Sequence, residues 1–395
     1  MIIAILGRQP KLGLAELESL YGAERVQPLG EHAAQVDADE VDFSRLGGAI
    51  KLAKPVTTLP TTKWSDLFRH VAEYVPEHLV RLPEGKIKLG FSVYGIQTST
   101  QHLFRAGLEL KKACRAIGRS VRIVPNTALE LNSAQVIHNQ LTSELGMELL
   151  FINAGDHTVV ARTTAVQDVD DYAKRDFGRP KRDAFVGMLP PKLAQTMVNL
   201  AVDHSDDPER LPIRPARILD PFCGTGVVLQ EALLMSYSAY GSDINEKMVT
   251  YSRHNLEWLK TTYKLDAAMF TLEVADATNH HWEPPFDYVV CEGYLGQPMS
   301  QEPPREKLQA VMHECNTIMQ GFLKNIGAQL KPGTRLCIGS PAWFVQNKIH
   351  HLPVLDDLES LGYNRIDFKH VSLKDLVYHR TDQIVGRELV VLIKE

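Results

Sequence analysis

Residues 217–226 read RILDPFCGTG and are followed at once by VVLQEALL. The first apolar run predicts a strand that ends at Asp220, and the second predicts a helix, so the chain turns sharply between them. Gly224 and Gly226 fall in that turn, where glycine permits a positive φ and lets a ligand approach the backbone. The start of the following helix offers free N–H groups to such a ligand. This strand–glycine–helix unit predicts an α/β fold with a ligand site at the turn.

Two more acidic residues stand at the ends of the next two predicted strands. Asp243 in YGSDIN follows Asp220 by about 20 residues, the distance at which a carboxylate accepts hydrogen bonds from ribose hydroxyls. Asp276 in VADAT is placed to accept from an adenine amino group, with Ala277 on the base edge. The segment lacks GxGxxG, and an acid before the glycine turn suits an amine-bearing ligand better than a pyrophosphate. Together these features predict S-adenosyl-L-methionine as the cofactor.

The sequence after residue 190 alternates strand and helix. A helix at 191–202 precedes the glycine turn, and the last two strands lie so close in sequence that we expect them to pair antiparallel. The pattern predicts a doubly wound, Rossmann-like seven-stranded sheet whose last strand is antiparallel. The predicted strands are RILDPF, SAYGSDI, FTLEVAD, DYVVCEG, TRLCIGS, NRIDFKH and ELVVLIK.

The front half of the sequence has an α+β pattern instead. IIAIL at 2–6 predicts a first strand rather than a signal peptide, because no basic segment precedes it. VDFSRLGGAIKLA at 41–53 predicts a helix, and QHLFRAGLELKKACRAIGR at 101–119 predicts a longer one. We expect four segments: an N-terminal α+β, ferredoxin-like domain at 1–60, a second domain at 61–166, a polar linker at 167–189 and the doubly wound domain at 190–395.

Several of these stretches resemble one known family. DPFCGTG, GSDI and the seven-strand pattern resemble class I methyltransferases, especially those acting on amino groups of nucleic acids. LGRQPKLGLAELESLYG and RPKRDAFVGMLPPKLAQTMVNLA resemble the archaeal and eukaryotic tRNA guanosine-10 N2-methyltransferases. VRIVPNTALELNSAQVIHNQL is similar to the THUMP domain of RNA-modifying enzymes, which makes the segment 61–166 THUMP-like. The resemblance covers nearly the whole chain, and it implies that these further residues lie against the cofactor: Pro221, Phe222, Cys223, Ile244 and Phe185.

The overall composition limits the other possibilities. The net charge is −5, so any nucleic-acid surface has to be a local patch. The five cysteines include no CxxC pair, so we expect neither a metal site nor a disulfide framework. A reducing, cytoplasmic location fits this best. No stretch approaches the roughly 20 apolar residues that span a bilayer, so we expect no membrane partner.

Two local clusters of basic residues stand out against this acidic background. One lies along the predicted helix at 101–119 and ends at Arg122, and the other lies in the linker near 174–182. They predict contacts with RNA phosphates, which position an RNA without reading its sequence. The residues are Arg105, Lys111, Lys112, Arg115, Arg119 and Arg122 in the first cluster, and Lys174, Arg175, Lys181 and Arg182 in the second.

The candidate catalytic loop is CEGYLG at 291–296, at the end of the fourth strand. Enzymes that methylate an exocyclic amine carry an acid or amide, two prolines and an aromatic at this place. Aligning the aromatic with Tyr294 puts Cys291, a weak acceptor, at the acid position. Shifting by one residue puts Glu292 there and keeps a carboxylate beside the aromatic, which is the alignment we favour. Tyr294 is then expected to stack on a flipped base and Glu292 to accept from its amine.

These features predict an enzyme that transfers a methyl group from S-adenosyl-L-methionine to an exocyclic amine, and the resemblance implies that this amine is N2 of a guanosine in tRNA, at position 10. One alternative is a DNA or rRNA amino-methyltransferase with the same catalytic domain, and the THUMP-like half argues against DNA. Another is an RNA-binding protein whose methyltransferase fold is inactive, which the altered loop supports. A small activator subunit, which some eukaryotic relatives require, is not assignable from the sequence.

Overall fold

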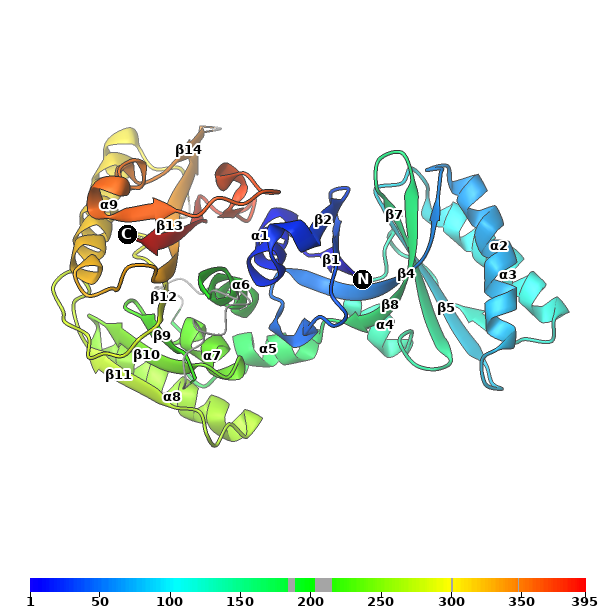
Figure 1. The fold of residues 1–395 in the computed structure, drawn as a ribbon, viewed down its shortest axis with the longest axis horizontal. Coiled ribbons are helices and arrows are strands. Elements are labelled where there is room, and N and C mark those ends of the chain that lie inside the picture. The colour runs from blue at the N-terminus through cyan, green and yellow to red at the C-terminus, as the bar shows by residue number, and fades with distance from the viewer. Residues whose placement is uncertain (184–188, 203–214, 300, 347) are drawn as a thin grey trace. The chain divides into compact units, whose positions relative to one another are not determined.

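The structure is a computed structural model that describes residues 1–183, 189–202, 215–299, 301–346 and 348–395. It contains two compact units, shown in Figure 1. The N-terminal unit comprises Met1–Leu17, Ala23–Ser44 and Gly48–Asp170, and the C-terminal unit comprises Glu18–Gly22, Arg45–Gly47 and Asp171–Glu395. Each unit has its own β-sheet.

The sheet of the N-terminal unit has eight strands in the order β2-β3-β1-β4-β8-β7-β5-β6. It joins both predicted N-terminal segments, because β4 pairs with β1 on one side and with β8 on the other. The predicted boundary between two domains at residue 60 falls within one continuous sheet, and it stays a prediction. The strands are β1 Ile2–Leu6, β2 Val26–Leu29, β3 Ala33–Val36, β4 Ala49–Leu59, β5 Ile87–Tyr94, β6 Val121–Ile123, β7 Gly146–Asn153 and β8 Thr158–Val166. The helices that begin in this unit are α1 Pro10–Tyr21, α2 Trp64–Val80, α3 Thr100–Ala116, α4 Ser133–His138 and α5 Val169–Phe177.

Helices α2 and α3 pack on each other (Figure 1), and α3 also contacts β6. Each helix buries an apolar stripe with helical spacing, for example Leu67 and Val71 on α2 and Leu103 and Leu110 on α3. These residues share one core with the inward side chains of β5 and β7. The opposite face of α3 stays exposed and carries its basic residues.

The helix predicted at 41–53 is wrong. The chain forms a short 3-10 turn at Phe43–Arg45 and then enters β4. A Cβ at Gly48 would lie 2.3 Å from the Cα of Gly13, so the backbones approach more closely than a helix with side chains permits. Lys51, which an amphipathic helix would expose, is fully buried and donates to Glu148 Oε1 at 2.5 Å. Burial lowers the pKa of Lys51, and tertiary pairing overrides the local helical pattern here.

The C-terminal unit contains all seven predicted strands, in the order β11-β10-β9-β12-β13-β17-β15. The first five are parallel neighbours, and β17 runs antiparallel between β13 and β15, as predicted for the last strand. Two short strands, β14 and β16, pair with β13 and β17. The strands are β9 Arg217–Asp220, β10 Ser238–Asp243, β11 Phe270–Val274, β12 Tyr288–Glu292, β13 Arg335–Val345, β14 Lys348–His350, β15 Tyr363–Arg365, β16 Val377–Tyr378 and β17 Val385–Lys394.

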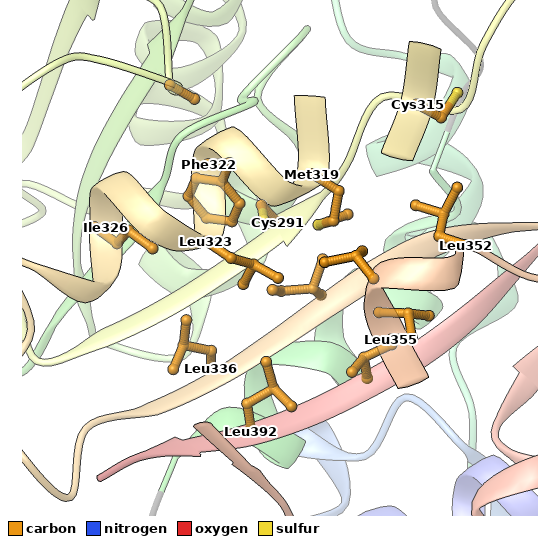
Figure 2. Packing of buried hydrophobic residues seen from close by; sticks show 14 of the residues in the cluster. Cys291, Cys315, Met319, Phe322, Leu323, Ile326, Leu336, Leu352, Leu355 and Leu392 are labelled. Carbon is orange, nitrogen blue, oxygen red and sulfur yellow. The ribbon is translucent and has the colours of Figure 1, made fainter. Parts of the chain in front are cut away.

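Helices cover both faces of this sheet. The longer helices of the unit are α6 Pro191–Ala201, α7 Val227–Leu234, α8 Glu246–Tyr263 and α9 Arg305–Gly327. On one face α6 contacts β12, β13 and β17. On the other face α9 supplies Met319, Phe322 and Ile326 to the core shown in Figure 2. The strand order reverses between β9 and β12, and ligands of such sheets bind at the carboxyl ends of the strands at that reversal.

Candidate active site

The turn after β9 is shaped by glycine and clamped by its neighbours. Gly224 has φ +51° and Gly226 has φ +85°, both in the left-handed region that favours glycine. A Cβ on Gly226 would lie 2.8 Å from Ser252 Oγ, so the turn also packs too closely on α8 for a side chain. Ser252 Oγ donates to the carbonyl of Gly224 at 2.8 Å, and Asn255 Nδ2 donates to the carbonyl of Thr225 at 2.8 Å. Hydrogen bonds from α8 therefore fix the turn, while Gly224 and Thr225 also line the cavity described below.

Three carboxylates stand at the ends of β9, β10 and just after β11. Asp220 is 2% exposed, and burial together with the nearby Asp243 and Glu292 raises its pKa well above the ordinary value. Asp243 accepts from the backbone N–H of Gly224 at 3.0 Å, which links the second strand to the glycine turn, and burial raises its pKa. Asp276 accepts from the backbone and hydroxyl of Thr278, and these hydrogen bonds lower its pKa.

One cavity of about 740 Å³ joins these groups. Its described lining includes five carboxylates and no lysine, arginine or histidine. A lining whose charged side chains are all carboxylates favours a positively charged ligand. The predicted cofactor residues that line it are Asp220, Pro221, Phe222, Cys223, Gly224, Asp243, Ile244, Asp276 and Ala277. Gly226, the residue that caps the N-terminus of α7, is not part of the lining, and Phe185 lies outside the described residues.

The candidate catalytic loop closes the other side of the same cavity, where Glu292 and Tyr294 contribute to the lining. Cys291 does not, because successive residues of a strand point to opposite faces. Its side chain is fully buried in the core beside Met319 and Phe322, as Figure 2 shows, and burial raises its pKa well above the ordinary value. The structure thus corrects the assignment of Cys291 as a catalytic candidate and favours the alignment through Glu292.

Glu292 is the last residue of β12 and makes an ion pair that the sequence analysis missed. Its Oε1 accepts from Arg387 Nε at 2.5 Å, and the two side chains are only 14% and 8% exposed. Arg387 lies on β17, on the face that α6 covers further along the strand. The sequence GRELVVLIK could have indicated this pair. Strand alternation puts Arg387 on the same face as the apolar Leu389 and Val391, where a charge without a partner is costly, so a buried acidic partner is expected.

Two glycines pack the loop against α9 in place of the absent prolines. A Cβ on Gly293 would lie 2.8 Å from Met319 Cε, and one on Gly296 would lie 2.5 Å from Val311 Cγ1. Gly296 also has φ +81°. Tyr294 sits between them, half-buried against the core, and burial raises its pKa. Close packing on α9 therefore orders this loop, although its backbone lacks the restriction that prolines impose.

Comparison with known proteins agrees with this geometry. The family model described as "Methyltransferase domain" matches residues 214–380. The structure of TrmN from Thermus thermophilus aligns with 100% of this chain and 99% of that protein, with a TM-score of 0.52 and 18% identity. The C-terminal unit has the class I methyltransferase fold.

Two curated relatives are tRNA-modifying enzymes by name. The chain is 31% identical over 216 residues to the tRNA (guanine(10)-N2)-dimethyltransferase of Methanothermobacter thermautotrophicus, covering 54% of this chain and 53% of the relative. It is 39% identical over 106 residues to the enzyme of the same name from Pyrococcus abyssi, covering 27% and 25%. The chain thus matches about half the length of the first relative and a quarter of the second.

The predicted RNA-binding residues divide into exposed and structural ones. Arg119 is half-exposed and donates to the carbonyls of Leu82 and Pro83, so it ties the turn after α3 to the turn after α2. Arg175 is buried and pairs with Glu231 at 2.6 Å, which corrects its assignment as a phosphate contact: it ties α5 to α7 of the methyltransferase fold. The exposed or half-exposed members are Arg105, Lys111, Lys112, Arg115, Arg122, Lys174, Lys181 and Arg182.

The part of the chain that the structure describes contains no helix with the length and hydropathy to cross a bilayer. In the same part, no three His, Cys, Asp or Glu side chains are grouped as a metal site would require.

Proposed function

We propose that this chain transfers a methyl group from S-adenosyl-L-methionine to the exocyclic N2 amine of a guanosine in tRNA, at position 10. The observation that carries the proposal is the single acidic cavity that joins the glycine turn to Glu292 and Tyr294. The names of the curated relatives supply the nucleoside and the RNA.

The cavity suits this cofactor for physical reasons. S-adenosylmethionine carries an ammonium and a sulfonium, and the described lining offers carboxylates without competing basic groups. Asp220 is assigned to the ammonium side, Asp243 to the ribose hydroxyls, and Asp276 with Ala277 to the adenine edge. Gly224 presents bare backbone toward the cavity, which permits the close approach that a side chain would block.

The acceptor side supplies positioning and a hydrogen-bond acceptor. When bound, the cofactor would supply an electrophilic methyl group, and S-adenosylhomocysteine would leave with the electron pair of the broken S–C bond. The exocyclic amine of guanine is a poor nucleophile because its lone pair is conjugated with the ring. Glu292 accepts an N–H of that amine, which localises the lone pair and stabilises the positive charge that develops on nitrogen. As the new N–C bond forms, the nitrogen gives up one proton, and Glu292 is placed to receive it. Tyr294 offers its ring to the flipped base.

The N-terminal unit is assigned to RNA binding as a THUMP-like domain. The exposed basic residues of α3 and of the segment before α6 are the groups proposed to contact phosphates. The five cysteines are all free and buried, which supports a reducing, cytoplasmic location. The expectation of a small activator subunit stays a prediction, and no described residue is assigned to it.

The test is to incubate the purified chain with tritiated S-adenosylmethionine and, in separate reactions, tRNA, rRNA or DNA. Digestion then identifies the labelled nucleoside. N2-methylguanosine from tRNA is the expected result. Label in DNA, in rRNA or in adenine would contradict the proposal and support an amino-methyltransferase with another substrate. Calorimetric binding of the cofactor without label in any nucleic acid would instead identify an inactive binding protein.

A further inference from the structure

The pair between Glu292 and Arg387 links two strands that are not neighbours. β12 pairs with β13, and β13 pairs with β17, so the arginine has to cross a strand to reach the carboxylate. Gly339 of β13 stands opposite both Glu292 and Leu389 in register, and it places no side chain on the face where the two groups meet. The register of the three strands therefore brings Arg387 and Glu292 together.

The geometry of the pair leaves part of the carboxylate available. Arg387 binds Oε1 through Nε, and Oε2 of Glu292 has no hydrogen-bond partner among the described residues. Glu292 lines the cavity, whereas Arg387 is not part of the lining. The arginine thus fixes one oxygen of a carboxylate that lines the cavity, while the other oxygen has no partner among the described residues.

The charge of the cavity makes such a partner necessary. Glu292 lies near enough to Asp220 to be one of the causes that raise the pKa of that group, so the two carboxylates repel each other. Asp243 adds a second negative charge near Asp220. The guanidinium of Arg387 is the cation that offsets this repulsion on the Glu292 side, through the 2.5 Å contact with its carboxylate.

We propose that Arg387 is a positioning residue for methyl transfer, which fixes the orientation of the Glu292 carboxylate toward the acceptor amine. This inference rests on the proposed function of the same cavity. It predicts that the arginine affects turnover through the carboxylate and has little effect on the cofactor, because Arg387 does not line the cavity.

The test compares Arg387→Met, which keeps the apolar stem and removes the charge, with Arg387→Lys, which keeps the charge without the planar guanidinium. The matched control is Arg365→Met. Arg365 pairs with Glu388 at 2.6 Å, and Glu388 is the residue next to Arg387 that points to the opposite face of β17. We expect kcat on tRNA to fall about 10- to 100-fold in Arg387→Met, to recover in part in Arg387→Lys, and to stay near wild type in the control. The KM for the cofactor should remain close to wild type in all three.

A double-mutant cycle with Glu292→Gln separates positioning from a general structural effect. If Arg387 acts through Glu292, the double variant Glu292→Gln with Arg387→Met is no slower than Glu292→Gln alone. Fully additive losses, or an unchanged kcat in Arg387→Met, would overturn the inference while leaving the proposed function intact. Wild-type protein that binds the cofactor but labels no RNA would overturn the proposed function itself.

Discussion

The two sides of the cavity are built in different ways. On the cofactor side, the turn after β9 is held by side chains of the next strand and helix, Asp243 of β10 and Ser252 and Asn255 of α8, which lie 19 to 30 residues from their partners. On the acceptor side, the loop after β12 depends on distant partners: Arg387 holds Glu292 across two strand interfaces, and α9 packs on Gly293 and Gly296. The first side is therefore formed by β9 and the two elements after α7, whereas the second needs a strand 95 residues further along the chain.

This difference predicts how each side responds to change. Substitutions on the cofactor side should alter binding of S-adenosylmethionine and the stability of the turn. Substitutions on the acceptor side should alter turnover and RNA binding, because those groups meet the amine and the base.

The largest effect is expected from Glu292→Gln, which keeps the shape and removes the negative charge. Loss of the acceptor should lower kcat by about 10²- to 10⁴-fold in a methylation assay, with cofactor affinity little changed. Glu388→Gln is the matched control, since it breaks the other Arg–Glu pair of β17 on the opposite face. Equal kcat values in the two variants would remove Glu292 from the chemistry.

Gly226→Ala tests the cofactor side, and Gly333→Ala is its control. Both glycines have φ +85°, but a Cβ at Gly333 meets nothing within 4 Å, whereas one at Gly226 lies 2.8 Å from Ser252 Oγ. The left-handed backbone alone costs alanine about 1–2 kcal/mol. We expect thermal unfolding to show a larger loss in Gly226→Ala and calorimetry to show weaker cofactor binding only there. Identical losses would mean that the close contact with α8 has no role.

Tyr294→Ala should weaken RNA binding through the lost ring. Stacking on a base contributes about 1–3 kcal/mol, so the KM for tRNA should rise about 10- to 100-fold. Tyr294→Phe keeps the ring and should stay near wild type in the same steady-state assay. A Phe variant as impaired as the Ala variant would assign the role to the hydroxyl instead.

The smallest effect is expected in the pH dependence of stability. The pKa of Asp220 is raised in the folded protein by burial, so its contribution to the free energy of unfolding is full at low pH and lost as pH rises through the raised pKa. Asp220→Asn removes this loss, so its stability relative to wild type should increase with pH in unliganded protein. Melting curves at several pH values measure the difference, and a gap that does not change with pH would contradict a raised pKa.

Much of the fold is readable from the sequence because its signals are local. All seven strands of the methyltransferase sheet follow from apolar runs that alternate with helices, and DPFCGTG marks the cofactor turn. The errors arise where distant contacts override a local pattern. The segment 41–53 has helical periodicity, but the close approach of Gly48 to Gly13 and the burial of Lys51 make it a strand.

Distant contacts also limit what the sequence predicts about the candidate site. Sequence places Cys291 and Glu292 side by side, and only the orientation of β12 shows which one faces the cavity. Charge alone does not distinguish the buried Arg175 from its exposed neighbour Lys174, because its partner Glu231 lies on another helix. Arg387 is distant in sequence from Glu292, so its pairing depends on a register that the sequence does not display.

The most direct test of the central claim uses two synthetic tRNAs that differ at position 10 only. One carries guanosine there and the other inosine, which lacks the exocyclic N2 amine. Incubation with the protein and S-adenosylmethionine, followed by digestion and mass spectrometry, measures methylated nucleosides in each. We predict N2-methylguanosine from the guanosine tRNA and no methyl incorporation into the inosine tRNA. Equal methylation of both RNAs would contradict the claim that this cavity transfers a methyl group to that amine.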